Sequence, residues 1–541
     1  MLCELNSLSR QPNGVISLPV SNPSTNELRR LSDSLGLRLR DDELEGVLRA
    51  VANALASYAR LDKLADPYPT PPTKRSRNRP LPENNPYGAW LWQGKIPPTS
   101  NGLLDGRSVV MKDNVSVAGL PMTIGSRVLA GHVSEVDATV VTRVLASGGT
   151  IPGTAVCEDL CFSGNSFTSA TGPVRNPYDP SRSSGGSSSG CAVLVALGEA
   201  DAAIGADQGG SVRGPAAWSG ITGLKPTYGL VPYTGMFPVE MTVDHAGPLA
   251  RTAAEVARLL DVVAGADGYD PRQNGVQRLP PGGYLGALGG NVAGTRVAIV
   301  TEGFDWPGLS EETVDVSVRE AVRLLERVGC TVTEVSIPWH REAVHIFAPI
   351  MAEGSTATMF RGNGMGTNWR GRYDPHLLRA FREGWRARAH EMSLSTKVQL
   401  LVGTYAREAT GGYYYARAQN LVASLQAAYD AVFAAFDIVA MPTLPMSPRV
   451  LPTSELPADV FMEQALDMSC NNCAFNLTGD PAVSIPCGLV DGLPVGLMLA
   501  AATGRDAQLL QFADVLQREL FPVPWPSAAE DGSHHLVEKE A

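Results

Sequence analysis

The sequence has few lysines, few histidines and no long apolar run. Of its 541 residues, seven are lysine and eight are histidine, whereas 37 are arginine. No apolar run approaches the roughly 18 residues that a membrane-spanning helix needs, and the first residues lack the charged and apolar segments of a signal peptide. The net charge of -11, with basic residues scattered along the chain, argues against a surface for nucleic acid. We therefore expect a cytoplasmic protein that binds neither membranes nor nucleic acids.

The spacings typical of a metal site are missing as well. The histidines are dispersed, and none belongs to an HExxH motif. The pairs Cys157/Cys161 and Cys470/Cys473 have metal-like or redox-like spacing, but a zinc site would need two such pairs or nearby histidines. We interpret these cysteines as buried, reduced thiols. The sequence predicts no metal and no cofactor.

Composition divides the chain into four predicted regions. Residues 1–65 are predicted to be helical, and residues 66–106 contain nine prolines, which exclude helix and central strand and indicate a surface linker. Residues 107–525 form the predicted main domain, and residues 526–541 a flexible tail. In the first region, acidic residues at 41–43 start a helix with one apolar face: Leu44, Val47, Leu48, Val51, Leu55 and Tyr58. That face could cover the main domain or make a subunit contact.

The main domain alternates predicted strands and helices. Asp137 is placed to cap a helix between the strands 107–111 and 150–156. The same rhythm recurs over 296–300, 312–328 and 330–337, and further strands and a last helix follow at 438–441, 482–486, 493–499 and 506–520. This order predicts an α/β fold with a mixed or parallel sheet. Residues 340–430 are predicted to be an inserted helical region that could wall a substrate pocket.

Two glycine-serine turns carry the strongest chemical signal. Gly185–Gly190 presents Ser187 and Ser188, and Gly209-Gly210 precede Ser211, 24 positions after Ser187. Each turn comes just before a predicted helix, where unpaired backbone N–H groups surround a serine hydroxyl. A single turn of this kind is common in ordinary loops, and the first lacks the spacing and the lysine of a phosphate-binding loop. Together they suggest a catalytic centre.

A nucleophilic serine needs a base, and no histidine lies beside either turn. His245 follows Ser211 by 34 positions, so a serine-histidine arrangement stays open, although His245 could equally be structural. Lys112 is the stronger candidate, because it ends an apolar strand where burial should lower its pKa and make it a general base. Its alternative role is a structural ion pair, for example with Asp113.

The motifs around these residues resemble those of a known family. The segment GGSSSGCAVLVALGEADAAIGADQGGSVRGPAAWSGITGLKPTYGLVP is similar to the signature of the amidase-signature hydrolases, as are SVVMKDNV around Lys112 and NLTGDPAVSIPCG near the C-terminus. The resemblance spans roughly residues 100–520 and is greatest to bacterial amidases of nitrile-degrading pathways. It implies an α/β fold with a large mixed central sheet covered by helices on both faces, an N-terminal helical extension, and a homodimer.

The resemblance also implies a catalytic triad. Ser211 is the implied nucleophile, Ser187 a bridging serine that follows a cis peptide bond, and Lys112 the base. The implied oxyanion hole is formed by the backbone N–H groups of Gln208, Gly209, Gly210 and Ser211, and the implied pocket residues are Cys161, Phe162 and Ser163. Cys161 and Phe162 could instead be simple core residues. Ser189 and Cys191 depart from the family pattern, in which a glycine and a serine are usual.

The implied activity is hydrolysis of the C–N bond of small carboxylic amides through an acyl-enzyme on Ser211. A carbamate or anilide hydrolase and the catalytic subunit of an amidotransferase are the alternatives. A non-catalytic protein that binds amides is the least expected reading, because all three triad residues are present.

Overall fold

The computed structural model describes residues 20–64, 75–273, 275, 280–452, 456–519 and 526. The chain divides into two units, Met1–Thr70 and Pro71–Ala541. Within the described residues, no helix combines the length and the apolar character required to cross a membrane. The predicted tail, apart from Pro526, lies outside the described residues.

The first unit contains two helices, α1 (Thr25–Ser34) and α2 (Asp41–Leu61). The Ser24 hydroxyl caps α1, and α2 begins at Asp41, where negative charge complements the helix dipole. Leu28 and Leu44 are buried, whereas the remaining apolar face of α2 is only partly covered and Tyr58 is exposed. The predicted amphipathic helix is therefore present.

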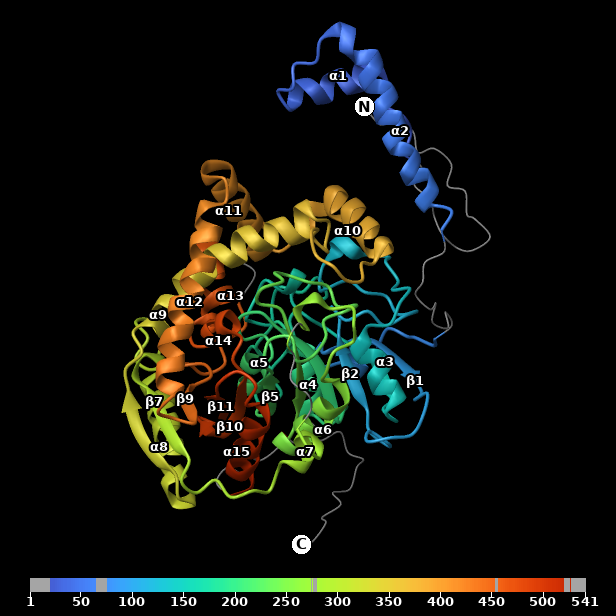
Figure 1. The fold of residues 1–541 in the computed structure, drawn as a ribbon. Helices are drawn as coiled ribbons and strands as arrows, with labels where there is room; N and C mark the ends of the chain where they lie inside the picture. The colour runs from blue at the N-terminus through green and yellow to red at the C-terminus, as the bar shows by residue number, and fades with distance from the viewer. Residues whose placement is uncertain are drawn as a thin grey trace. The chain divides into compact units, whose positions relative to one another are not determined.

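An eleven-stranded sheet forms the centre of the second unit (Figure 1). Its order is β1-β3-β2-β4-β6-β5-β10-β11-β9-β7-β8. Strands β2, β3 and β4 pair in parallel, as do β7, β8 and β9, and the other pairings are antiparallel. The bounds are β1 Trp90–Ile96, β2 Val109–Lys112, β3 Ile151–Ala155, β4 Ala202–Asp207, β5 Thr222–Lys225, β6 His245–Ala250, β7 Arg296–Val300, β8 Thr331–Val335, β9 Ile438–Pro442, β10 Ala482–Val490 and β11 Leu493–Ala500. The predicted mixed α/β fold is confirmed.

Helices cover both faces of this sheet. In β2, Val109 and Met111 belong to the core that includes α3 and α6, whereas Val110 packs in a second core with α4. This alternation follows from the two-residue period of a strand. The helices are α3 Thr139–Ala146, α4 Ser189–Ala196, α5 Arg213–Trp218, α6 Ala253–Val263, α7 Gly283–Gly286, α8 Glu312–Arg323, α9 Trp339–Pro349, α10 Pro375–Arg388, α11 Leu394–Thr410, α12 Tyr413–Phe433, α13 Ala458–Leu466, α14 Cys473–Thr478 and α15 Asp506–Glu519.

Residues 339–433 supply the helices α9 to α12, coloured yellow to orange in Figure 1. Helix α12 packs against both α9 and α11. Between α9 and α10 the chain continues as two π-helical segments, Ile350–Gly354 and Thr356–Arg361. Pro349 immediately precedes them and has no N–H to continue the α-helical ladder. Wide turns of this kind are frequent near functional sites, and Met351 lines the pocket described below.

Two local expectations differ from the structure. Asp137 does not cap α3, which begins at Thr139 without a side-chain cap, because the Asp137 carboxylate is bound by the Arg75 guanidinium at 2.6 and 2.7 Å. In addition, β1 lies within the proline-rich segment that we expected to be only a linker. The prolines flank β1 rather than interrupt it, and β1 pairs with β3 at the edge of the sheet.

Candidate active site

One pocket in the second unit gathers most of the predicted site residues. Its wall includes Ser211 and residues from each of the other predicted groups: Cys161, Phe162, Ser163, Gln208, Gly209 and Gly210. The helical region contributes Phe347, Met351 and Gln399, and the chain around α13 contributes Leu466, Met468 and Ser469. Segments that are far apart in the sequence therefore meet at the end of β4.

A buried ion pair shapes the turn that carries Ser211. Asp207 ends β4, and its carboxylate accepts hydrogen bonds from the Arg213 side chain at 2.9 and 3.1 Å and from the Asn476 amide at 2.9 Å. Burial alone would raise the pKa of Asp207, but the Arg213 charge and these hydrogen bonds hold it well below its usual range. Both side chains of the pair are fully buried, so the turn is fixed by a charged anchor beneath it.

The backbone N–H groups of this turn differ in availability. The N–H of Gly210 donates to Asp207 Oδ1 at 2.8 Å, so it is already used. The N–H groups of Gln208, Gly209 and Ser211 have no hydrogen-bond partner among the described residues. Gly210 has a φ of +117°, and a Cβ atom there would lie 2.8 Å from Asn472 Cβ, so only glycine fits. Three of the four predicted oxyanion donors are thus free.

Lys112 and Ser187 lie together at the base of the site. Lys112 ends β2, and its Nζ atom is 2.8 Å from Ser187 Oγ and 3.4 Å from the Ala206 carbonyl oxygen. Both side chains are fully buried. The Gly186–Ser187 peptide bond is cis, at the position where the family resemblance implies one.

Lys112 does not pair with its neighbour Asp113. The Asp113 carboxylate instead accepts hydrogen bonds from Thr123 and from the Gly125 N–H. Among the described residues, no carboxylate forms an ion pair with Lys112. The alternative prediction of an ion pair between Lys112 and Asp113 is therefore wrong. The Lys112 amine instead contacts Ser187.

The two serine turns are joined directly. The Ser188 N–H donates to the Ser211 carbonyl oxygen at 3.2 Å, and Gly186 lines the same pocket as Ser211. Ser189, which departs from the family pattern, donates to Glu158 Oε1 at 3.0 Å, and Thr168 donates to the other oxygen of Glu158. Burial raises the pKa of Glu158 to about 7 despite these donors. The substitution at 189 thus adds a hydrogen bond beneath the loop.

The three predicted pocket residues have different surroundings. Phe162 and Ser163 are almost completely buried, and the Ser163 hydroxyl donates to the Asn165 carbonyl oxygen at 2.6 Å. Cys161 is partly exposed and has a φ of +65°. A hydrogen bond with Cys157 lowers the pKa of the Cys161 thiol, and burial opposes this. Cys161 therefore lies beside the triad candidates, not in the core alone.

His245 lies apart from the hydrogen bonds that the two serines form in the structure. It begins β6, and its Nδ1 atom is 2.8 Å from the Val243 carbonyl oxygen. Burial lowers its pKa well below the ordinary value. None of its described hydrogen bonds involves Ser187 or Ser211, so the serine-histidine alternative has no geometric support.

In the Cys470/Cys473 segment, the two asparagines between the cysteines form the hydrogen bonds that hold the chain in place. The Asn471 amide donates to the Gly303 and Pro442 carbonyl oxygens at 2.8 Å each. The Asn472 amide donates to the carbonyl oxygens of Thr443 and Met468. These asparagines fix the chain that packs against Gly210. Within the described part of the chain, no group of three or more histidine, cysteine, aspartate or glutamate side chains is placed to hold a metal.

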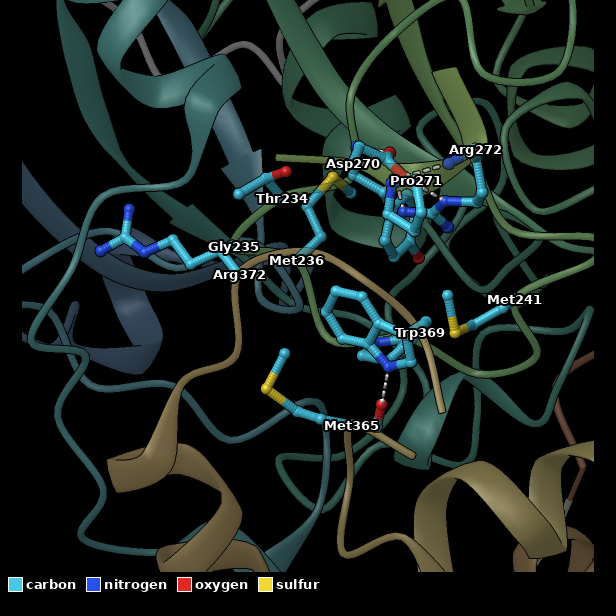
Figure 2. Close-up of a pocket in the computed structure, with 12 residues that line it drawn as sticks. Thr234, Gly235, Met236, Met241, Asp270, Pro271, Arg272, Met365, Trp369 and Arg372 are labelled. Carbon is cyan, nitrogen blue, oxygen red and sulfur yellow. Dashed lines mark hydrogen bonds and ion pairs between the residues drawn. The ribbon is translucent and has the colours of Figure 1, made fainter. Parts of the chain in front are cut away.

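Tyr233 lines a second pocket, which Figure 2 shows in close-up. The Arg272 guanidinium is paired with Asp270 at 2.8 and 2.9 Å and lies 4.6 Å from the centre of the Tyr233 ring. Figure 2 shows this ion pair opposite Trp369. Tyr233 in turn accepts a hydrogen bond from Gln208, which lines the first pocket. Tyr233 therefore connects the two pockets.

Sequence reasoning missed several residues that build the site. Asp207 and Arg213 are six positions apart and flank the Ser211 turn, and opposite charges beside a glycine-serine turn could have been recognised as its anchor. Glu158, Asn472 and Asn476 lie in segments that no local pattern connects to the turns. Only the folded sheet brings them together.

Comparison with known proteins agrees with this geometry. The family model named Amidase matches residues 91–510. The chain is 43% identical to an enantioselective amidase of Rhodococcus rhodochrous over 94% of this chain and 98% of that protein. It is 38% identical to a glutamyl-tRNA(Gln) amidotransferase subunit from Natronomonas pharaonis, over 80% of this chain and 99% of that protein. The solved structure of a peptide amidase from Stenotrophomonas maltophilia superposes with a TM-score of 0.64 at 26% identity, over 79% of this chain and 85% of that chain.

The family match covers far more than half of the chain and includes both serine turns and Lys112. The fold built on this mixed sheet superposes on that of the solved peptide amidase. The chain therefore belongs to the amidase signature family of hydrolases and is an amidase.

Proposed function

We propose that this amidase hydrolyses small carboxylic amides to the acid and ammonia or an amine, through an acyl-enzyme on Ser211. One observation carries the proposal: Lys112 Nζ lies 2.8 Å from Ser187 Oγ, both fully buried, behind a pocket whose wall contains Ser211. A lysine in contact with a serine beside a second serine is the arrangement that a proton relay needs.

The reaction begins with proton transfer. Lys112 Nζ, in contact with Ser187 Oγ, accepts the hydroxyl proton of Ser187, and Ser187 accepts the hydroxyl proton of Ser211. Ser211 Oγ then forms a bond to the carbonyl carbon, whose π electrons move onto the carbonyl oxygen. The C–N bond breaks when this electron pair returns, and the leaving nitrogen receives a proton from Ser187, which Lys112 replaces.

The N–H groups of Gln208, Gly209 and Ser211 are the proposed donors to the developing oxyanion, since that of Gly210 is bound to Asp207. Each such donor stabilises the transition state by about 3 kcal/mol in comparable sites. Water then attacks the Ser211 ester while its proton passes through Ser187 to Lys112, and the same relay returns a proton to Ser211 Oγ when the bond between the acyl carbon and Ser211 breaks. The carboxylic acid leaves, and the resting hydroxyl of Ser211 is restored.

The pocket wall that would contact the acyl group of the substrate contains both apolar and polar side chains. Phe347 and Met351 offer apolar surface, whereas Gln399 and Ser469 offer hydrogen bonds. Such a wall suits small aliphatic or aromatic acyl groups. Carbamates and anilides present the same carbonyl group and are alternative substrates of the same chemistry.

An amidotransferase subunit would use the same residues. The greater extent of the match to the enantioselective amidase, which reaches 94% of this chain, favours an enzyme that acts alone. A homodimer remains a prediction, as does the cytoplasmic location. Gel filtration of the purified chain, combined with ammonia release from a simple primary amide, separates the two alternatives.

The decisive test is an activity screen. Purified wild-type protein and Ser211→Ala are compared on primary amides, anilides and carbamates. The proposal expects turnover of at least one primary amide by the wild type and its loss in Ser211→Ala. Equal turnover by both proteins would exclude Ser211 as the nucleophile.

A further inference from the structure

We propose that Phe347 limits branching at the α-carbon of the acyl group, the carbon that is bonded to the carbonyl carbon of the substrate. Amides with an unbranched α-carbon are accepted, whereas amides with a fully substituted α-carbon are excluded. The inference rests on the proposed hydrolysis through Ser211. It deepens that proposal, because it names the residue that selects among acyl groups and the feature that it selects.

The Phe347 ring contacts the turn that carries the nucleophile. A Cβ atom at Gly209 would lie 2.7 Å from Phe347 Cζ, and 3.2 and 3.6 Å from the two Cε atoms of the ring. Since Cζ is the nearest of the three, the tip of the ring points at Gly209. Both residues line the pocket, and Phe347 is partly exposed. The ring tip therefore forms the part of the wall beside this turn.

This contact places the ring close to the reacting group. The Gly209 N–H has no partner among the described residues and is a proposed oxyanion donor. A carbonyl oxygen bound there would lie about 3 Å from the Gly209 nitrogen. The α-carbon is only two bonds from that oxygen, so its substituents and the tip of the Phe347 ring must share the space beside Gly209.

The acyl group, and not the leaving nitrogen, lies on the Phe347 side. In the proposed mechanism Ser187 protonates the nitrogen, which must therefore face the turn of Ser187, whose Gly186 also lines the pocket. The carbonyl carbon is planar, so the acyl group points away from the nitrogen. Phe347 reaches the pocket from the helical region, as does Met351. These apolar side chains thus contact the acyl group.

The ring is held at a fixed distance from the turn. Phe347 follows His340 by seven positions on α9, so both lie on the same face of this helix. His340 is buried, and its Nε2 atom lies 3.0 Å from Asn471 Oδ1. The next residue, Asn472, packs against Gly210. One segment therefore holds both α9 and the Ser211 turn, and a firmly held ring is a sharp size limit.

The test changes only the branching of the acyl group. The value of kcat/KM is measured for propanamide, 2-methylpropanamide and 2,2-dimethylpropanamide, which all release ammonia and differ by methyl groups on the α-carbon. We expect the ratio of the dimethyl to the unbranched amide to rise about 10- to 100-fold in Phe347→Ala, because the space of the ring becomes free. An unchanged ratio would overturn the inference.

Phe433→Ala is the matched control. Phe433 is also partly buried and packs against the same core, but it is not among the described residues that line this pocket. Its ratio should equal that of the wild type, and an equal rise in both variants would overturn the inference. If Phe347→Ala does not fold, Phe347→Leu should raise the ratio by a smaller factor. An unchanged ratio in folded Phe347→Leu would also overturn it.

A second pair of substrates tests the side of the carbonyl group that Phe347 contacts. N-methylpropanamide and propanamide differ only in the leaving amine, so their kcat/KM ratio should be the same in the wild type and in Phe347→Ala. A change of this ratio without a change of the acyl ratio would overturn the inference. Failure of the proposed function looks different: the wild type would then hydrolyse none of these amides, or Ser211→Ala would retain activity.

Discussion

The Nζ atom of Lys112 lies 2.8 Å from the Oγ atom of Ser187, with both side chains buried from solvent. The lysine therefore contacts Ser187, while Ser211 lies on the pocket wall. In the proposed mechanism, Lys112 acts on Ser211 through Ser187. Loss of the base and loss of the relay should consequently have similar effects.

Replacing Lys112 with methionine should abolish the relay while filling the same volume. We expect kcat for a primary amide to fall about 10²- to 10⁴-fold, the usual contribution of a general base. Steady-state kinetics give the rate, and circular dichroism shows whether the variant is folded. Turnover near the wild-type rate in a folded Lys112→Met protein would contradict the assigned role.

The buried pair of Asp207 and Arg213 should be essential for stability. Arg213→Met leaves the Asp207 carboxylate buried without its charged partner, which should lower the free energy of unfolding by about 3–5 kcal/mol. The matched control is Arg296→Met, because Arg296 pairs with Asp437 at a side-chain exposure of 49%, so its loss should lower the free energy of unfolding much less than the loss of Arg213. Urea unfolding measures both, and equal losses would show that burial of the pair does not matter.

Stability should decrease as the pH rises toward neutrality. Burial raises the pKa of Glu158 from 4.5 to about 7, and that of Asp113 from 3.8 to about 7. Between these limits the folded state holds protons that the unfolded state has released, so the free energy of unfolding falls with increasing pH. Each group contributes a slope of up to about 1.4 kcal/mol per pH unit.

Glu158→Gln removes one of the two carboxyl groups that hold a proton in the folded state. The slope of unfolding free energy between pH 5 and pH 7, measured with denaturant, should therefore be shallower in Glu158→Gln than in the wild type. Parallel slopes would mean that Glu158 does not titrate in this window.

Cys161 should be the most reactive thiol of the described cysteines. Its pKa is lowered by the hydrogen bond with Cys157, although burial opposes this. Burial raises the pKa of Cys473 and of Cys487 to about 12 each. Because the thiolate is the reactive form, limited iodoacetamide should label Cys161 first and slow amide turnover by obstructing the pocket.

Peptide mass spectrometry locates the label, and Cys161→Ala is the control, since it should keep its activity under the same treatment. Labelling of Cys473 before Cys161, or full activity of enzyme labelled at Cys161, would refute this prediction.

The fold and the main site residues follow from local signals. The strands beside Lys112, the helix at Asp41 and the two glycine-serine turns are each marked by periodicity or by glycine within a few residues. The family motif then relates Lys112, Ser187 and Ser211, which the structure brings to one place.

Long-range partners could not be predicted in the same way. Asp137 has the sequence position of a helix cap, yet Arg75, 62 positions away, binds it. The sequence predicts that the Gly210 N–H is a free oxyanion donor, but in the structure it donates to the Asp207 carboxylate. Likewise, the Nε2 atom of Gln208 donates to Tyr233 and Asp244, which lie 25 and 36 positions further along the chain. Such choices are made by tertiary hydrogen bonds between segments, and no local pattern records them.

The most direct measurement of the central claim is rapid-quench mass spectrometry during turnover of a primary amide. The account predicts a protein species heavier by one acyl group, with the group attached to Ser211, that disappears as substrate is exhausted and is missing in Ser211→Ala. Turnover with an acyl group on another residue, or an acyl adduct that persists in Ser211→Ala, would contradict it.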